Sequence, residues 1–222
     1  MKGTRTYHDY LTAIYILQDE GEVPIAARVA EYLGVSAPTV SQTLRRLQQK
    51  KLVTVDGDHI LRLTSKGQEE AQTLIRRHRL LERWLTDILG LDWASADVEA
   101  QRLETSVSAL VEERLDQHLG RPTTCPHGNP IPRKGAQRKP LLQPLPLFPP
   151  GSMVEVVRIS ELAEDMVDLL RYLEGVGLIP GAPVSIEEER EPGELLLTTP
   201  RGTFAVKETV ARYIHAEKRM TS

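Results

Sequence analysis

The sequence predicts a mostly α-helical protein with small β parts: a winged helix-turn-helix, a helical middle segment and a strand-rich C-terminal module. Two observations lead to this fold class. Helices, a glycine-containing turn and a hairpin signal follow one another near the N-terminus, and nine of the fifteen prolines fall between Pro122 and Pro150. A proline-rich stretch cannot continue a helix, so it separates the helical front from the β-rich back.

Composition is typical of a cytoplasmic globular protein. Apolar residues make up 40% of the 222 residues and charged residues 27%, enough for a core and a solvated surface. We expect no membrane span and no secretory signal, and one cysteine cannot form an internal disulfide. The net charge of −3 divides into +3 over residues 1–79 and −6 over the remainder, which permits a front that faces nucleic acid.

The front predicts three helices and a hairpin. A helical apolar pattern begins at Tyr7 and ends at Gly21, and a short helix over Ala26–Leu33 follows. Ser36 is a favourable N-cap for a third helix, which extends to Lys50. Two β-rich runs then flank an Asp-Gly-Asp-His turn, which is a strong hairpin signal.

The middle predicts two long amphipathic helices, over residues 64–91 and 94–120, and the back predicts a β-rich module. Four short runs after residue 151 alternate or are rich in β-branched residues, with Gly or Pro between them. A single helical pattern over residues 161–178 interrupts them.

Helix, turn, helix and hairpin in that order predict a winged helix-turn-helix whose second helix enters the major groove of DNA. Gln42 could bond an adenine edge, while short hydroxyl side chains and basic side chains could hold phosphates. The predicted DNA-contacting residues are Arg28, Ser36, Pro38, Thr39, Ser41, Gln42, Arg45 and Arg46. A three-helix domain with solvated basic ends, or a protein-interaction module, would show the same pattern.

Helix spacing brings possible metal ligands together. His78 and Glu82 are four residues apart and therefore share one helical face. Asp97, Gln101 and Glu104, at spacings of four and three, share another. Taken alone, the first set is more often a surface ion pair than a metal site, and the second is more often a solvated face.

Three further side chains extend this set. Asp9 lies in the first helix, and Cys125 and His127 flank a proline in an extended turn that would aim thiolate and imidazole the same way. A mixture of Cys, His, Glu and Asp suits Mn(II), Fe(II) or Zn(II). A buried inert thiol and a Cys–His nucleophile of a hydrolase are the alternatives, but no orienting group or oxyanion site accompanies the pair. We therefore do not expect an enzyme.

The chain resembles the diphtheria toxin repressor and manganese transport regulator family of metal-dependent repressors over essentially its full length. The resemblance rests on SAPTVSQTLRRL, LTSKGQEEA, RHRLLERWLTDILGL, VSALVEERLDQHLG and CPHGNPIP, in that order. It implies a homodimer, a palindromic operator in double-stranded DNA, a divalent metal as corepressor and an SH3-like (FeoA-like) C-terminal barrel. The expected domains are 1–73 for DNA binding, 74–132 for dimerisation and metal binding, 133–150 as a proline-rich linker, and 151–222 for the SH3-like module.

The resemblance also implies two metal sites. The first would use Glu82, Cys125, His127 and Asp165, with His78 in support and Asp168 as a weaker candidate. The second would use Asp9 and Glu104, but it departs from the family pattern because Gln101 replaces a Glu or Cys, Thr105 replaces a His and Asp97 replaces a His of iron-responsive members.

The first site resembles the one that manganese-responsive members build with a Cys-Pro-His motif, so manganese is the expected metal. Iron is the alternative, because a thiolate prefers Fe(II) to Mn(II). The other alternative is a winged-helix regulator that needs no metal.

Overall fold

A computed structural model describes residues 6–133, 142–163, 166–187 and 192–219. It divides into two compact units, Met1–Arg77 and His78–Ser222, and each is described by itself. Helix α4 (Ser65–Arg83) begins in the first unit and ends in the second.

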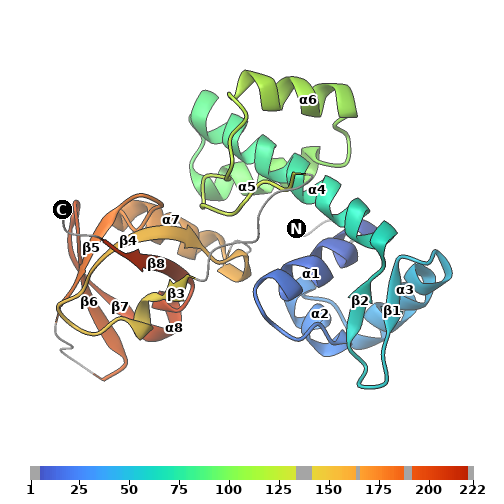
Figure 1. Cartoon of the computed structure of the whole chain (residues 1–222), viewed down its shortest axis with the longest axis horizontal. Coiled ribbons are helices and arrows are strands. Elements are labelled where there is room, and N and C mark those ends of the chain that lie inside the picture. The colour runs from blue at the N-terminus through green and yellow to red at the C-terminus, as the bar shows by residue number, and fades with distance from the viewer. Residues whose placement is uncertain (1–5, 134–141, 164–165, 188–191, 220–222) are drawn as a thin grey trace. The chain divides into compact units, whose positions relative to one another are not determined.

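The first unit is a three-helix domain with a hairpin, coloured from blue to cyan in Figure 1. Its elements are α1 (Tyr7–Asp19), α2 (Ala26–Leu33), α3 (Ala37–Gln49), β1 (Val53–Val55) and β2 (Leu61–Leu63). The two strands pair antiparallel. The predicted helix-turn-helix and wing are thus confirmed.

The turn between α2 and α3 has the chemistry that the sequence predicts. Gly34 ends α2 with a left-handed φ of 63°, which glycine adopts without a Cβ penalty. Ser36 caps α3, accepting a hydrogen bond from the backbone N–H of Thr39 at 3.4 Å. Val40 and Leu47 on α3 are fully buried. The turn therefore fixes which face of α3 packs and which stays exposed.

The middle of the chain is helical but is divided differently from the prediction. Helix α4 is followed by a π-helical turn (Trp84–Ile88), α5 (Trp93–Leu103) and α6 (Ala109–His118). The prediction of one continuous helix over residues 94–120 was wrong. Ser108 accepts a hydrogen bond from the N–H of Val111 at 3.3 Å and caps a new helix, because short hydroxyl side chains favour caps over helix interiors.

The C-terminal part is a six-stranded antiparallel sheet in the order β3-β8-β4-β5-β6-β7. The strands are β3 (Gln143–Pro144), β4 (Met153–Ile159), β5 (Pro183–Ile186), β6 (Glu194–Thr199), β7 (Gly202–Lys207) and β8 (Ile214–Lys218). The helices between them are α7 (Val167–Val176) and the short α8 (Glu208–Ala211), with 3₁₀ turns at Leu145–Leu147 and Glu161–Ala163. The four predicted strands and α7 are confirmed, whereas β3, α8 and β8 were not predicted.

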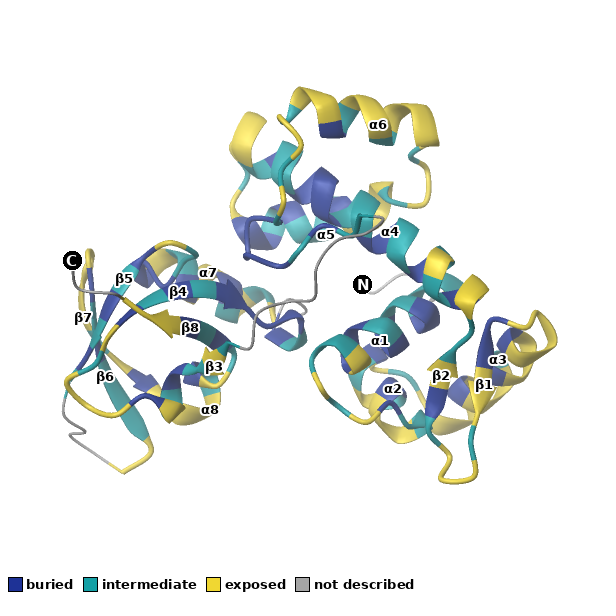
Figure 2. Ribbon diagram, viewed as in Figure 1, coloured by how far each residue is buried: buried dark blue, intermediate teal, exposed yellow. Residues whose placement is uncertain are grey.

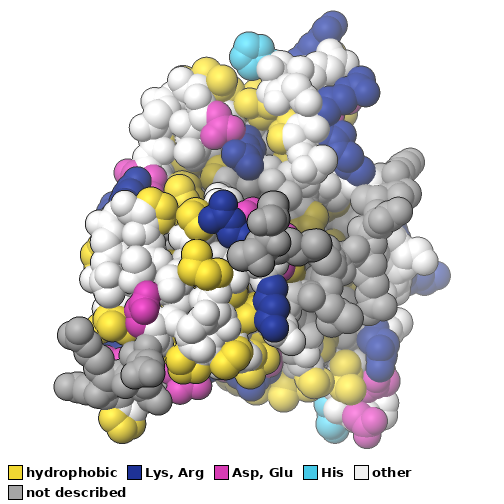
Figure 3. Space-filling model, turned by 60° about the vertical axis from the view of Figure 1, so that its left-hand side comes forward, with side chains coloured by type: hydrophobic (Ala, Val, Ile, Leu, Met, Phe, Trp, Pro, Cys, Tyr) yellow, Lys and Arg dark blue, Asp and Glu magenta, His cyan; other side chains and the backbone are white. Residues whose placement is uncertain are grey.

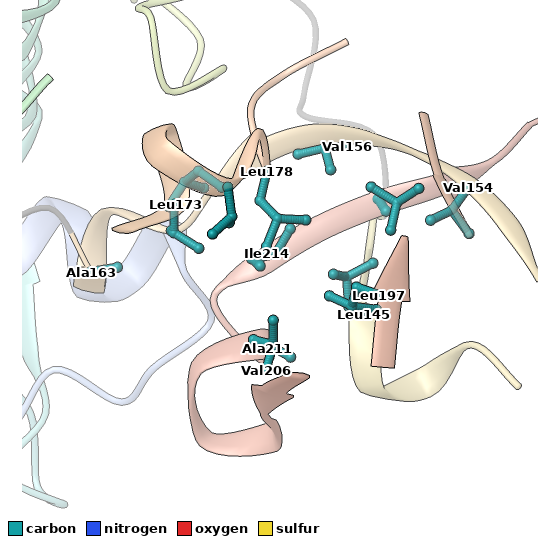
Figure 4. Close-up of a cluster of buried hydrophobic side chains, with 14 of the residues drawn as sticks. Leu145, Val154, Val156, Ala163, Leu173, Leu178, Leu197, Val206, Ala211 and Ile214 are labelled. Carbon is teal, nitrogen blue, oxygen red and sulfur yellow. The ribbon is translucent and has the colours of Figure 1, made fainter. Parts of the chain in front are cut away.

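Figure 4 shows the core of this sheet, where aliphatic side chains from the strands, α7 and α8 meet. Leu145, from the proline-rich segment, is fully buried in it, and so are Leu173 and Ile214. Trp93 and Ala94 at the start of α5 belong to the same apolar cluster. The N-terminal end of α5 therefore packs into the core of the C-terminal domain.

The surface differs strongly between elements. Helix α6 is largely exposed in Figure 2, and two of its apolar side chains, Leu110 and Val111, are 68% and 47% exposed. On the face shown in Figure 3, charged side chains of both signs lie among apolar and uncharged ones. No helix in the described residues is long and apolar enough to cross a membrane.

Gly67, in the first turn of α4, packs against the backbone of Leu52. A Cβ at this position would lie 2.1 Å from the carbonyl oxygen of Leu52. We expect Gly67→Ala to lower the free energy of unfolding by about 1–3 kcal/mol, because the backbone must shift.

The matched control is Gly175→Ala in α7, where a Cβ would meet nothing within 4 Å. This change should raise the free energy of unfolding by about 0.5–1 kcal/mol, since alanine is the better helix former. Urea titration of both variants measures the difference, and a stabilising Gly67→Ala would contradict the packing described.

Candidate metal centre and DNA-contacting face

Three buried side chains of the second unit form a compact group. Glu82 on α4, Cys125 and His127 offer ligand atoms that lie within 4.8 Å of one another. His127 Nδ1 lies 3.1 Å from Glu82 Oε1 and 3.9 Å from Cys125 Sγ. All three residues have no exposed surface, so their polar atoms must be satisfied inside the protein.

A tight turn positions the thiol and the imidazole. The N–H of Cys125 donates to the carbonyl of Asn129 at 2.8 Å, and the N–H of Gly128 donates to the carbonyl of Cys125 at 3.0 Å. Gly128 has a φ of 85°, and a Cβ there would lie 2.1 Å from the carbonyl oxygen of Val157. Only glycine fits this position, which explains the Cys-Pro-His-Gly order.

Helix α4 also holds this turn. Arg83 donates from Nε to the carbonyl of Thr124 at 2.8 Å and from a terminal nitrogen to the carbonyl of Cys125 at 3.1 Å. The ring of Trp93 contacts the His127 ring edge-on at a centroid distance of 4.7 Å. The imidazole is therefore fixed by its neighbours before any ion binds.

A second group shares Glu82 with the first. His78, Glu82 and Asp97 also offer ligand atoms within 4.8 Å of one another. His78 Nε2 lies 3.3 Å from Asp97 Oδ1 and 3.7 Å from Glu82 Oε1. The other ring nitrogen, Nδ1, lies 2.9 Å from Glu104 Oε2. Such a carboxylate contact fixes the tautomer of an imidazole and turns its free nitrogen toward a metal.

The Glu82 carboxylate is fully buried, and within the described part of the chain its Oε1 lies 3.1 Å from His127 Nδ1 and 3.7 Å from His78 Nε2. Burial alone raises its pKa, but the charges of His127 and His78 outweigh burial and hold the pKa well below its usual range. The same contacts act on His78. Burial lowers the pKa of His78, while Glu82, Asp97 and Glu104 together raise it well above its usual range.

The donor set fits a divalent transition metal. A buried carboxylate, a buried thiol and two imidazoles supply the oxygen, sulfur and nitrogen ligands that such ions take. A bound cation would take over the compensation of the Glu82 charge that the imidazoles provide.

The remaining predicted ligands lie outside these two groups. Asp9, in the first turn of α1, bonds with Thr6 in a capping box of the first unit. Gln101 is exposed on α5, and Asp168 is exposed on α7 with Arg171 at 3.9 Å. Asp165 lies outside the described residues. Glu104, predicted to belong to the second metal site together with Asp9, contacts His78 within the second unit.

The predicted DNA-contacting residues are all exposed on the first unit. All of those on α3 and its cap are exposed, whereas Val40, Leu44 and Leu47 are buried. Arg28 on α2 is exposed, but it forms ion pairs with Glu22 and Glu31. The exposed set consists of Ser36, Pro38, Thr39, Ser41, Gln42, Arg45 and Arg46.

Sequence reasoning missed several buried polar residues of the second unit. Arg79 and Glu161 form a buried ion pair, and Asn129, which follows the Cys-Pro-His-Gly stretch, is fully buried and donates to the carbonyl of Ile159. One signal was available: Arg79 stands three residues before Glu82 and therefore shares its helical face. A cation on the face of a metal-binding carboxylate suggests a structural role.

Three family models match the chain in succession. The N-terminal DNA binding domain of the iron dependent repressors matches residues 3–60, and their metal binding and dimerisation domain matches residues 64–133. The FeoA domain matches residues 143–218. The iron-dependent repressor IdeR of Mycobacterium tuberculosis is 38% identical, with 94% of this chain and 95% of that protein covered. The chain belongs to the diphtheria toxin repressor family.

Other members of the diphtheria toxin repressor family are also similar along their whole length. The diphtheria toxin repressor of Corynebacterium glutamicum is 35% identical, with 94% of each chain covered. Among solved structures, a manganese-dependent transcriptional repressor in complex with manganese has a TM-score of 0.85 at 31% identity, with 96% of this chain and 100% of that chain covered. The manganese regulator SloR has a TM-score of 0.80 at 32% identity, with 98% and 100% covered.

Membership confirms the predicted fold class and the prediction that this protein is a metal-dependent DNA-binding repressor rather than an enzyme. The hydrolase and the metal-independent regulator are thereby set aside. The metal that activates the chain is a separate question, since relatives named for iron and for manganese both match it.

Metal binding should release a proton from His78 even at pH values above the ordinary pKa of histidine. The pKa of His78 is raised well above its usual value, so its imidazole is protonated until the pH passes that raised pKa. A metal needs the neutral ring. The apparent Mn(II) affinity should therefore rise with pH through this range and level off above it.

Isothermal titration in buffers of different ionisation enthalpy measures the protons released at each pH. His78→Gln should remove the high-pH part of the release, whereas His118→Gln, an exposed histidine on α6, should leave it unchanged. Proton release that ends below the ordinary histidine pKa would contradict the His78 contacts described.

Proposed function

We propose that this protein is a manganese-responsive repressor of metal-ion homeostasis that binds a palindromic operator as a homodimer. The observation that carries the proposal is the buried group of Glu82, Cys125 and His127, whose ligand atoms lie within 4.8 Å of one another. The fully exposed polar and basic face of α3 supplies the DNA contact.

The metal ligands proposed are Glu82, Cys125, His127 and Asp165. His78 and Asp97 lie on the other side of Glu82 and can share the ion or hold a second one. Glu104 is proposed to orient His78 rather than to bind the metal, because it contacts the Nδ1 atom while Nε2 faces Glu82 and Asp97.

The bound ion supplies positive charge that joins ligands from separate segments. Glu82 belongs to α4, the helix that continues directly from the winged domain, while the thiol and imidazole belong to the turn after α6. Metal binding would restrict motion between these segments and favour one spacing of the two recognition helices in a dimer. An ion shifts the equilibrium between the DNA-binding spacing and other spacings only if it binds the DNA-binding state more tightly.

The dimer is proposed to form through the helical middle segment. The family model for this segment is described as a metal binding and dimerisation domain. Leu110 and Val111 of α6 leave apolar surface exposed, together with Leu115 in a hollow of about 770 Å³. Covering such a surface with a second copy would be favourable, since burial of apolar area drives association.

Iron is the alternative metal. Thiolate ligands bind Fe(II) more strongly than Mn(II). The relative IdeR is named an iron-dependent repressor, and two of the matching family models are described as domains of iron dependent repressors. Manganese is supported by the oxygen-rich neighbourhood of Glu82, Asp97 and Glu104 and by the solved structures named as manganese regulators.

Mn(II) should increase the affinity for operator DNA by about 5- to 150-fold, the usual range of an allosteric coupling. The DNA would be selected from a random duplex pool with the Mn(II)-loaded protein, and affinity measured by fluorescence anisotropy. Glu82→Gln should abolish the response, because both ligand groups share this carboxylate.

The control for that variant is Glu99→Gln, which removes an exposed acid of α5 that pairs with Arg102. It should respond to Mn(II) like the unaltered protein. Equal DNA affinities with Mn(II), with anaerobic Fe(II) and with a chelator would refute the proposed function.

Cys125→Ser distinguishes the two metals. Replacing the thiolate by a hydroxyl should weaken Fe(II) binding by at least about tenfold more than Mn(II) binding, because iron gains more from the soft ligand. Anaerobic competition against a chromophoric chelator measures both constants. Equal losses for the two ions would remove ligand softness as an argument for iron.

Two substitutions on α3 should act differently on DNA. Gln42→Ala should relax the preference at one base pair by about 1–3 kcal/mol, since Gln reads adenine edges. Arg45→Ala should weaken binding to all duplexes and reduce the slope of log affinity against log salt by about 1. Arg102→Ala, an exposed arginine of α5, is the control and should change neither. An unchanged base preference in Gln42→Ala would refute its role.

A further inference from the structure

Arg79 is an almost fully buried cation on the metal-binding face of α4. It stands between His78 and Glu82 and is 2% exposed. Its Nε donates to Glu161 Oε1 at 3.0 Å, and one terminal nitrogen donates to the same carboxylate. The other terminal nitrogen donates to the carbonyl oxygen of Pro130. One guanidinium thus contacts the end of the Cys-Pro-His turn and the C-terminal domain at once.

Glu161 comes from the 3₁₀ turn that follows strand β4, and it is 3% exposed. The same strand contacts the turn through its backbone. Asn129 donates from Nδ2 to the carbonyl of Ile159 at 2.8 Å, and the N–H of Ile159 donates to the carbonyl of His127 at 2.8 Å. The residue that carries the imidazole is therefore tied to the C-terminal domain by its own backbone.

These contacts place the two ligands of the turn between two supports. Helix α4 supports the turn through Arg83 on the Cys125 side and through Arg79 on the Pro130 side. The geometry of Arg79 itself depends on Glu161, because a buried guanidinium without its anion is strongly disfavoured. Loss of the Glu161 charge would remove the carboxylate that orients the Arg79 guanidinium. The hydrogen bond from Arg79 to the carbonyl oxygen of Pro130 would then be weakened.

We propose that Arg79 and Glu161 are positioning residues for the metal centre, and that through this buried pair the C-terminal domain holds Cys125 and His127 in a ligating arrangement. Neither residue binds the ion itself. The predicted change in metal affinity rests on the proposed metal-binding function. The effect on the turn exists without any metal.

A reciprocal effect follows. If the pair favours the ligating form of the turn, then a metal bound to that form favours the pair by the same free energy. Docking of the C-terminal domain and metal binding would thus support one another, even though Arg79 and Glu161 are not ligands.

The first test measures the turn in the metal-free protein. Cys125 is the only cysteine of the chain and is fully buried, so its rate of reaction with an aromatic disulfide reports local opening. Glu161→Gln in the full-length chelated protein should raise this rate by at least about tenfold. Glu155→Gln, the same change on strand β4 at a site away from the pair, should leave the rate unchanged.

A second variant covers the case in which Glu161→Gln does not fold. Arg79→Lys keeps the positive charge but loses the planar fork, and it should raise the rate as well. In the double variant, the two effects should not add, because both changes break the same pair. Additive effects, or a thiol as protected as in the unaltered protein in both single variants, would overturn the proposal.

The second test measures Mn(II) affinity of the same variants by chelator competition. Glu161→Gln should bind Mn(II) about 10- to 100-fold more weakly, which is the usual effect of losing a residue that orients the metal ligands. A faster thiol reaction with unchanged Mn(II) affinity would overturn the positioning role. An unaltered protein that binds no Mn(II) or Fe(II) would refute the proposed function, while the thiol rates would still decide whether the pair supports the turn.

Discussion

A fully buried carboxylate is the constraint on which the metal-binding part of the second unit depends. Glu82 has no exposed surface, and the positive charges of His127 and His78 hold its pKa below the usual range although burial acts in the opposite direction. Burial of a charge without such compensation is disfavoured by roughly several kcal/mol. The helix that carries Glu82, the helix that carries Asp97 and the turn that carries His127 must therefore converge on this point, and the remaining contacts of the unit serve that convergence.

Apolar packing and polar contacts have different roles in this convergence. Trp93 inserts into the apolar core of the C-terminal domain and also contacts the ring of His127, which joins α5 to that domain without directional bonds. Hydrogen bonds from Asn129 and Arg83 then set the orientation of the turn. Apolar burial brings the segments together, and directional bonds determine where the ligand atoms lie, because only the latter depend steeply on geometry.

The sequence was most informative where local chemistry determines local structure. The Gly34 turn, the Ser36 cap and the Cys-Pro-His turn follow from neighbouring residues, so they were predictable. The break before Ser108 was missed because an apolar stripe continues across it. The pairing of Arg79 with Glu161 spans 82 positions, and no local pattern contains such a contact. Glu104 was identified as functional, but its actual partner, His78, depends on how two helices pack.

Gly128 restricts how this protein can change in evolution. Its backbone approaches Val157 so closely that no side chain can replace hydrogen there, and its left-handed conformation already disfavours other residues. The path of the chain between positions 125 and 129 is therefore fixed independently of the ligands on either side. Substitutions at Cys125 or His127 can exchange one side chain for another while the loop keeps its shape. The chemical groups that this turn presents can thus diverge by single changes, whereas its backbone path is retained.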